Sequence, residues 1–441
     1  MTAEMTETGA DTGTGAPGIP RVLPAGAIRG LGAHDDRYGP VRLRAAELIA
    51  EVQRAGLAGR GGAAYPAGRK LAAVRERAGL RGAMLVANGM ESEPASAKDA
   101  ALLARAPHLV LDGIDLAAEA VRAREAAICV RRPAQAEALI AAVAERAKAG
   151  RGMVGVNVLL VPERYVASAE SSLVRYLNGG PALPGFSPPR PFERGVRGRP
   201  TLVSNVETLA NMALIARHGA GWYRSAGTPD APGSALVTVA GAVRRPGVHE
   251  IALGTPLRDV LALSEVIGPE PAAVLAGGYF GSWLPGGRPL EVPASPAALR
   301  AAGASFGAGI FLVLPAGGCG LAETARVVRY LAGQSAGQCG PCRNGLPEMA
   351  QALELVAFTG GRGGARAVRS LRELSGFVEG RGACHLPDGV VKLVASALRV
   401  FADDVRQHER GGPCPGARGG RSALVPALSD PVSTELRVSA R

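Results

Sequence analysis

Length, composition and charge set the first limits on this chain. Its 441 residues suffice for two to four domains. The net charge of +12 comes mostly from scattered arginines and aromatic residues make up only 4% of the chain, so we expect no nucleic-acid partner. No apolar run reaches the length of about 18 residues that a membrane span needs. Residues 1–20 are acidic and Thr/Gly-rich, which predicts a cytoplasmic protein with a loose N-terminal tail.

The first half of the chain alternates helical and strand patterns. Apolar spacing predicts a helix over residues 41–55 that ends at Gly56, and a second helix over residues 70–78. Further strand and helix patterns follow at residues 83–87, 98–123, 126–130, 133–149 and 154–161. This alternation predicts an α/β domain with a mainly parallel sheet.

Two shorter helices are expected at the end of this domain. Residues 167–173 open the first one, and the proline-rich stretch 181–200 is expected to wrap a site as an ordered loop. Ser204 followed by Glu207 has the spacing of a capping box, so we expect the second helix to begin with Ser204 as its N-cap.

The second half of the chain predicts two further units. Residues 227–233 form a Pro/Gly/Asp linker, and the patterns up to about residue 293 indicate a small β-grasp-type module. A strand at 310–314 then precedes four helical patterns, over residues 322–333, 347–359, 365–377 and 390–406. These helices predict a small bundle, and the Gly, Pro, Arg and Ser residues from 411 onward predict a disordered tail.

A glycine-rich loop lies between the first two helices. Gly59, Gly61 and Gly62 allow backbone N–H groups to approach an anion closely. Three cations and one aromatic ring accompany them, at Arg60, Arg69, Lys70 and Tyr65. The loop therefore predicts a site for a nucleotide or flavin phosphate. Because it follows a helix and not a strand, it is not a standard Rossmann fingerprint.

Three of the six cysteines gather in the helical region. Cys339 and Cys342 form a C-x-x-C pair between two helices, and Cys384 lies in the next loop but one. Such a pair fits zinc, thiol redox chemistry or an iron–sulfur cluster, and a cluster normally takes four cysteines. His385, Cys319 or a non-protein ligand could supply the fourth ligand. The alternative is a domain that has lost its metal.

Five sequence blocks occur in the order seen in one known family, at residues 59–66, 88–99, 170–173, 200–209 and 335–345. The chain resembles the flavoprotein subunit of complex I, the NADH-binding 51 kDa or F-type subunit, shared with the diaphorase subunits of NAD-linked hydrogenases and formate dehydrogenases. The resemblance runs from about residue 40 to 408 and implies an α/β multidomain fold.

The implied domains are a Rossmann-like FMN/NADH domain, a β-grasp SLBB domain and a C-terminal four-helix iron–sulfur domain. Their bounds are expected at residues 41–226, 234–300 and 320–408, with a disordered tail and lead-in at 1–40 and a disordered tail at 411–441.

The resemblance also implies an activity and site residues. Hydride would pass from NAD(P)H to FMN, and single electrons through a 4Fe-4S cluster to a ferredoxin-like or membrane partner. The implied flavin contacts are Gly59, Arg60, Gly61, Gly62, Lys70, Asn88, Glu91, Ser204 and Asn205. Tyr65 would stack on the dinucleotide, and Glu93 and Glu170 would flank the nicotinamide as the catalytic pair. The cluster ligands would be Cys339, Cys342 and Cys384.

The chain departs from the family pattern at several of these positions. Ala64 and Met90 replace a glycine and an acid near the flavin, and Ala169 leaves one acid where the family has two. Ser204 replaces one of two asparagines, and Ala336 replaces the first of three closely spaced cluster cysteines. These departures predict a divergent paralogue. It would be either an NADH dehydrogenase-like enzyme or a non-catalytic scaffold or assembly subunit that keeps the fold without hydride chemistry.

Overall fold

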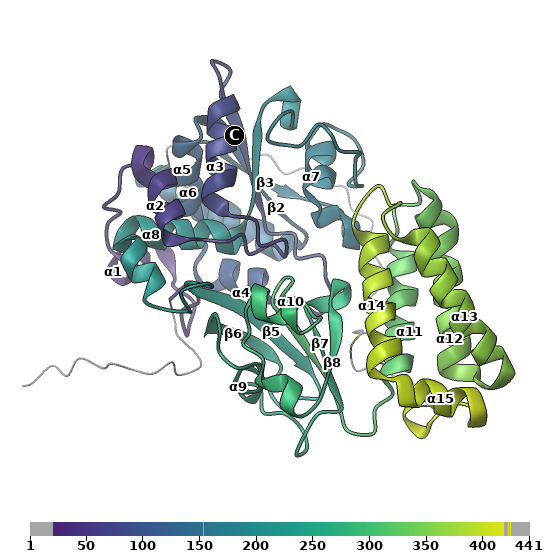
Figure 1. The fold of residues 1–441 in the computed structure, drawn as a ribbon. Helices are drawn as coiled ribbons and strands as arrows, with labels where there is room; N and C mark the ends of the chain where they lie inside the picture. The colour runs from purple at the N-terminus through teal and green to yellow at the C-terminus, as the bar shows by residue number, and fades with distance from the viewer. Residues whose placement is uncertain (1–20, 153, 419–421, 423, 425–441) are drawn as a thin grey trace, which may run out of the picture.

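The computed structural model describes residues 21–152, 154–418, 422 and 424, and it contains three domains (Figure 1). An α/β domain comes first, a β-rich domain lies beneath it in the view of Figure 1, and a helical domain stands to one side of both. This arrangement confirms the predicted fold class.

The first domain is built on a four-stranded sheet of order β3-β2-β1-β4, in which all neighbouring strands are parallel. The strands are β1 (Ala83–Asn88), β2 (Ala123–Val130), β3 (Val156–Leu160) and β4 (Thr201–Asn205). The sequence patterns predicted the first three strands and missed β4, because this five-residue strand directly follows the proline-rich stretch and shows no alternation of its own.

Helices cover both faces of the parallel sheet. They are α1 (Gly30–Tyr38), α2 (Ala45–Ala55), α3 (Ala67–Arg77), α4 (Lys98–Arg105), α5 (Pro107–Ala120), α6 (Pro133–Lys148), α7 (Glu170–Leu177) and α8 (Val206–Arg224). On one face, Leu85 and Ile128 join a core that includes α5 and α8. On the other face, Val86 and Cys129 pack in a smaller core with Leu173 of α7.

The lead-in to this domain is more ordered than the sequence predicted. Residues 1–20 lie outside the described residues, but α1 forms over part of the stretch expected to be disordered. The backbone N–H of Leu31 donates to Glu145 of α6 at 2.8 Å, and Leu31 is buried. The prediction of disorder up to residue 40 is therefore wrong for α1. This helix has only nine residues, too few to show a clear helical pattern in the sequence.

The second domain is a five-stranded sheet of order β6-β5-β9-β7-β8. Its elements are β5 (Ser234–Gly241), β6 (Gly247–Ala252), α9 (Leu257–Ala262), β7 (Ala273–Ala276), β8 (Ser282–Pro285), α10 (Pro296–Ala301) and β9 (Ile310–Leu314). Because β9 pairs with both β5 and β7, the sheet extends to residue 314, beyond the predicted boundary at 300.

The helical domain contains α11 (Gly320–Gly333), α12 (Leu346–Glu354), α13 (Gly361–Val378), α14 (Leu386–Val400) and α15 (Ala402–Gly411). The helix predicted over residues 390–406 is instead two helices that part at Phe401. The ring of Phe401 lies 5.1 Å from that of Trp283 and fills the space beside Gly320. Burying this ring turns the chain, so tertiary packing overrides the continuous helical pattern.

The tail predicted to be disordered from residue 411 is ordered where the structure describes it. A short 3-10 turn spans Pro415–Arg418, and Leu424 is only 2% exposed. The hydroxyl of Tyr279 in the second domain donates to the Leu424 carbonyl at 2.7 Å.

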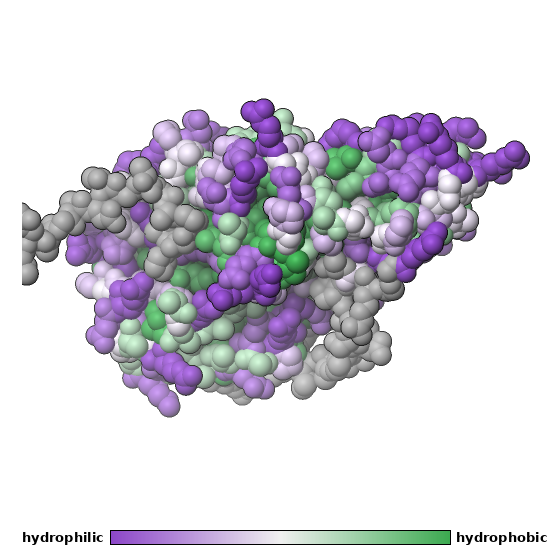
Figure 2. Space-filling model, turned by 90° about the horizontal axis from the view of Figure 1, so that it is seen from below, coloured by the Kyte–Doolittle hydropathy of each residue, from purple (hydrophilic) through white to green (hydrophobic). Residues whose placement is uncertain are grey.

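Within the described residues, no helix is long and apolar enough to cross a membrane. Seen from below, the surface of the helical domain is largely hydrophilic (Figure 2).

A buried network of charges joins the first two domains. Lys98 of α4 donates to Asp99 at 2.7 Å and to Glu207 of α8 at 2.8 Å. Glu207 also accepts the backbone N–H of Leu236 in β5 at 2.9 Å, and the guanidinium of Arg60 lies 3.7 Å from it. Although burial alone would lower it, the two carboxylates raise the pKa of Lys98. The cation therefore stays charged and holds the surrounding side chains together.

We expect this network to be necessary for stability. Lys98→Met keeps the length of the side chain but leaves the carboxylates of Asp99 and Glu207 buried without their cation, so unfolding should require about 3–5 kcal/mol less free energy. Arg44→Met is the matched control, because Arg44 forms an exposed pair with Glu47 on α2. Thermal unfolding of the variants measures the effect, and equal midpoints for Lys98→Met and wild type would contradict it.

Candidate functional site

The glycine-rich loop is a closed turn between α2 and α3. A backbone bridge joins Ala58 to Pro66, and the N–H of Gly59 donates to the Tyr65 carbonyl at 2.9 Å. Gly62 has φ +108°, which side chains rarely tolerate, and Ala64 has φ 51°. The family glycine expected at position 64 therefore matches a left-handed backbone, and Ala64 adopts it at a cost of about 1–2 kcal/mol.

The loop faces the carboxyl edge of the parallel sheet. Asn88 ends β1 and is the register partner of Asn205, which ends β4. A Cβ built on Gly61 would lie 3.5 Å from the Asn205 side chain. Ligands of open α/β sheets bind at this edge, so the structure brings three of the predicted flavin contacts together.

Asn205, not Ser204, caps the following helix. The Asn205 side chain accepts the N–H of Glu207 at 2.9 Å and donates to Asp99 at 2.7 Å. Ser204 lies within β4 and is 8% exposed. The predicted capping box is therefore wrong, because pairing of β4 with β1 extends the strand through Ser204 and the Glu207 side chain serves the buried network.

A cation and a carboxylate meet in front of this edge. Lys70 of α3 forms an ion pair with Glu170, the first residue of α7. Asn88 donates to the carbonyl of Ser168 at 2.9 Å, which holds the start of α7 over the end of β1. Tyr65 is 51% exposed, so its ring is accessible to a flat ligand. These side chains come from separate elements and line one side of the sheet.

Two predicted flavin contacts are instead occupied within the protein. The guanidinium of Arg60 donates to the Tyr223 hydroxyl and to the Ser234 carbonyl, each at 2.8 Å. The carboxylate of Glu91 accepts two N–H groups at the start of α4, from Asp99 at 2.9 Å and from Ala100 at 3.0 Å. Arg60 thus joins two domains and Glu91 caps a helix. Their roles in flavin binding stay predictions.

Glu93 lies where the three domains meet. Its carboxylate accepts the backbone N–H of Tyr279 at 2.8 Å and the hydroxyl of Tyr165 at 3.2 Å. The Tyr165 ring lies 6.2 Å from that of Tyr330 in the helical domain. Burial raises the pKa of Glu93 to about 8, against the two hydrogen bonds that lower it. At neutral pH this carboxyl is therefore largely protonated. The role of Glu93 and Glu170 as a pair flanking the nicotinamide stays a prediction.

The three predicted cluster cysteines lie together at one end of the helical domain. Although burial opposes it, the backbone N–H groups of Ala383 and Cys342 and the Cys342 thiol lower the pKa of Cys339. Burial and the charge on Cys339 together raise the pKa of Cys342 to about 11 and also raise the pKa of Cys384. The Cys342 thiol and the two amide donors thus favour a thiolate at Cys339, the form that binds metal.

Contacts anchor the thiol loop to the first domain. Gln338 accepts from Arg175 of α7 at 2.7 Å and donates to the Pro184 carbonyl at 2.8 Å. Gln334 accepts the N–H of Tyr165 at 3.1 Å. The cysteines therefore lie next to the helix that begins with Glu170, on the cofactor side of the molecule.

A second group of possible metal ligands escaped the sequence analysis. The ligand atoms of Cys319, His408 and Cys414 lie within 4.8 Å of one another. Cys319 begins α11, whose 14 residues span about 21 Å, whereas the thiol loop follows the far end of that helix. Cys319 is therefore not placed to be the fourth ligand of the other three cysteines, as the sequence had allowed.

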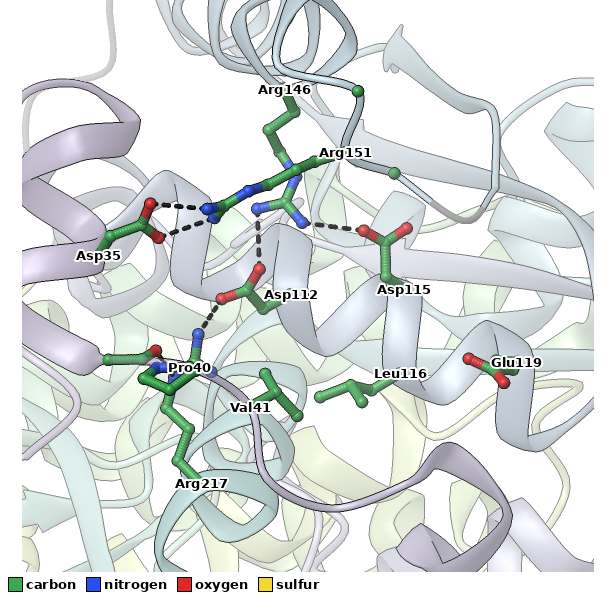
Figure 3. A pocket seen from close by; sticks show the side chains of 13 residues that line it. Asp35, Pro40, Val41, Asp112, Asp115, Leu116, Glu119, Arg146, Arg151 and Arg217 are labelled. Atoms are coloured by element: carbon green, nitrogen blue, oxygen red, sulfur yellow. Dashed lines mark hydrogen bonds and ion pairs between the residues drawn. The ribbon is translucent and has the colours of Figure 1, made fainter.

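A separate cavity of about 590 Å³ lies among α1, α5, α6 and α8 (Figure 3). Its three arginines are paired within the protein: Arg151 pairs with Asp35, and Arg146 and Arg217 both pair with Asp112. Because these charges are engaged within the protein, we interpret this cavity as part of the packing between helices and not as the functional site.

The fold and the site together define a class. A glycine loop, two asparagines and a lysine meet at the carboxyl edge of a parallel sheet, where their N–H donors and charge suit a nucleotide phosphate. A loop with two of the three predicted cluster cysteines is held beside it by Gln334 and Gln338 on a helical domain. This is the arrangement of a nucleotide-dependent redox protein with a metal cluster.

Comparison with known proteins identifies the family. Residues 52–214 match the model of the Nuo51 FMN-binding domain, residues 236–264 match the SLBB domain, and residues 322–408 match the NADH-ubiquinone oxidoreductase-F iron-sulfur binding region. These matches assign the FMN and iron–sulfur binding regions to the first and third domains.

The similar full-length proteins share one name. The F-type subunit of the Mycobacterium tuberculosis NADH-quinone oxidoreductase is 32% identical over 394 residues, covering 84% of this chain and 86% of that protein. The F-type subunits of the Streptomyces coelicolor and Escherichia coli enzymes are 31% and 29% identical, covering 84% and 81% of this chain and 84% and 83% of their own lengths. The chain belongs to the family of F-type NADH-quinone oxidoreductase subunits, which confirms the resemblance seen in the sequence.

A solved structure agrees with this assignment. An NAD+-reducing NiFe-hydrogenase in the air-oxidized state superposes with a TM-score of 0.75 at 30% identity. The match covers 82% of this chain and 62% of the hydrogenase chain, so the present chain spans less than two thirds of that neighbour.

The raised pKa of Glu93 predicts how the stability of the chain depends on pH. The pKa of Glu93 in the folded chain lies above that of an unfolded glutamate, so between about pH 4.5 and pH 8 the folded chain binds more protons than the unfolded chain. The free energy of unfolding therefore falls as the pH rises through this window. Relative to Glu93→Gln, which does not titrate, wild type should lose up to about 1.4 kcal/mol per pH unit. Unfolding at several pH values measures the difference, and a difference that stays constant would show that Glu93 is not protonated.

Proposed function

We propose that this chain oxidises NADH with bound FMN and passes the electrons through an iron–sulfur cluster to a partner protein. The observation that carries the proposal is the meeting of the glycine loop with Asn88 and Asn205 at the sheet edge, directly beside the helix that anchors the cysteine loop. When bound, FMN supplies the chemistry that accepts a hydride from NADH and releases electrons one at a time.

The side chains around the sheet edge supply binding and orientation. The N–H groups of Gly61 and Gly62 and the ammonium of Lys70 would hold the phosphate. Asn88 and Asn205 present amides to the polar part of the flavin. Glu170, which is 46% exposed on its side chain, is free on its outer side to orient the carboxamide of the nicotinamide.

Cys339, Cys342 and Cys384 would hold the cluster. Ala336 is partly buried in the core of the helical domain and offers no ligand atom. The fourth position is therefore left to His385, which is exposed beside Cys384, or to a ligand that is not part of the chain.

The partner is proposed to be a redox protein with an acidic surface, such as a ferredoxin-like protein or a subunit of a membrane reductase. Four arginines of α13 are exposed along one face of that helix: Arg362, Arg366, Arg369 and Arg372. Such a stripe attracts acidic partners and speeds their association. The six cysteines among 441 residues are too sparse for a secreted disulfide scaffold, which supports a cytoplasmic location.

The test is NADH-dependent reduction of a small acceptor such as ferricyanide by the FMN-loaded chain.

Lys70→Met removes the cation proposed to bind the phosphate. A titration of the variant with FMN should therefore show binding about 10- to 100-fold weaker than in wild type, the range expected for a hydrogen bond to a charged group. Arg77→Met is the matched control, because Arg77 is exposed in the last turn of the same helix, at the end away from the glycine-rich loop.

Two results would contradict the proposal. Equal FMN affinity in wild type and Lys70→Met would remove Lys70 from the site. A wild-type chain that binds FMN yet never oxidises NADH or NADPH would favour the scaffold alternative.

A further inference from the structure

The strongest unassigned feature is the group of Cys319, His408 and Cys414. Cys319 precedes α11, His408 lies in the last turn of α15, and Cys414 follows that helix. Cys319 and Cys414 lie outside residues 322–408, the part matched to the iron–sulfur binding region. Folding brings the three together at the end of the helical domain opposite the cysteine loop.

The hydrogen bonds of His408 fix which ring nitrogen faces the thiols. Nδ1 lies 3.0 Å from the carbonyl of Val356, and a carbonyl only accepts, so Nδ1 carries the proton. Nε2 therefore presents its lone pair, 3.9 Å from the Cys319 sulfur. Metal-binding histidines typically donate their second nitrogen to a carbonyl or carboxylate in this way.

We propose that these three side chains bind a single zinc-type divalent ion. Two thiolates and one imidazole are the ligands that zinc prefers, and three protein ligands leave a fourth position for water. Ligand atoms of a tetrahedral zinc site lie ~3.8 Å apart or slightly less, as follows from Zn–S bonds of about 2.3 Å. The Cys319 sulfur and His408 Nε2 lie 3.9 Å apart, and all three ligand atoms lie within 4.8 Å of one another, so a small adjustment would bring them to this spacing. A four-iron cluster holds its ligands farther apart because the irons lie between them.

Burial and flexibility also suit an ion at this place. His408 is fully buried and Cys319 is 2% exposed, while Cys414 is partly exposed and leaves room for a water ligand. The N–H of Cys414 donates to Nε2 at 3.0 Å, and the metal would replace it as the partner of the lone pair. Gly411 and Gly412 precede Cys414, and because glycine has no Cβ its backbone adopts many conformations, so the segment can make this small adjustment.

The ion would act as a clamp on the C-terminal segment. Beyond Cys414, Ser422 donates to Glu323 of α11 at 2.5 Å, and the carbonyl of Leu424 accepts from Tyr279. Tyr279 is the residue whose N–H binds Glu93. The proposed site thus fastens a segment that reaches the junction of the three domains.

The test is the metal content of the full-length protein, purified without chelators and measured for zinc and iron in the same sample. Wild type should hold about one zinc per chain. Cys414→Ala and His408→Gln should bind zinc about tenfold or more weakly, so their zinc content should fall while their iron content stays unchanged. Cys129→Ala is the matched control, because Cys129 is a buried thiol in the first domain and its loss should change neither metal. Cys384→Ser should lose iron and keep zinc.

Cobalt(II) gives a second readout that does not depend on stability. Co2+ added to zinc-free wild type should produce thiolate-to-cobalt absorption in the near ultraviolet, and Cys414→Ala should lose it. Three outcomes would overturn the proposal: wild type without zinc after incubation with Zn2+ and gel filtration, zinc retained by Cys414→Ala, or a Cys319–Cys414 disulfide in anaerobically purified protein.

Discussion

The buried ion pair between Lys98 and Glu207 is the constraint on which the rest of the structure depends. Glu207 is the second residue of α8 and follows Asn205, so fixing its carboxylate also fixes the end of β4. The same carboxylate binds the backbone of β5 in the second domain, and Arg60 reaches it from the glycine loop. One buried charge thus sets the positions of the loop, the sheet edge and the neighbouring domain. Because an unpaired buried charge is costly, these elements cannot shift independently.

A second junction relates the cofactor region to the cysteines. Glu93 and Tyr165 come from the first domain, Tyr279 from the second and Tyr330 from the third. The protonated carboxyl of Glu93 can lie among these rings without a counter-ion, which a carboxylate could not do at low cost. The cysteine loop is tied to the same region through Gln334. Contacts between domains therefore hold the cysteine loop against the first domain.

The sequence predicted those features that repeat or lie close together in the chain. The helices around the glycine loop, the first three parallel strands and the C-x-x-C pair all have local patterns. The cap at Asn205 instead of Ser204 could not be predicted, because two residues suited to capping are adjacent and only pairing with β1 decides between them. The direction of Arg60 and the meeting of Cys319 with Cys414 depend on tertiary packing, which no local pattern records.

The central claim is that one chain takes electrons from NADH at the sheet edge and delivers them to an iron–sulfur cluster held by the three cysteines. The most direct measurement is an anaerobic NADH titration of the reconstituted chain, followed by visible absorbance and low-temperature EPR on the same samples. We predict that the flavin absorbance bleaches and that an iron–sulfur signal appears, and that Cys384→Ser bleaches without giving the signal. A colourless chain after reconstitution with iron and FMN, or an unchanged signal in Cys384→Ser, would contradict the account.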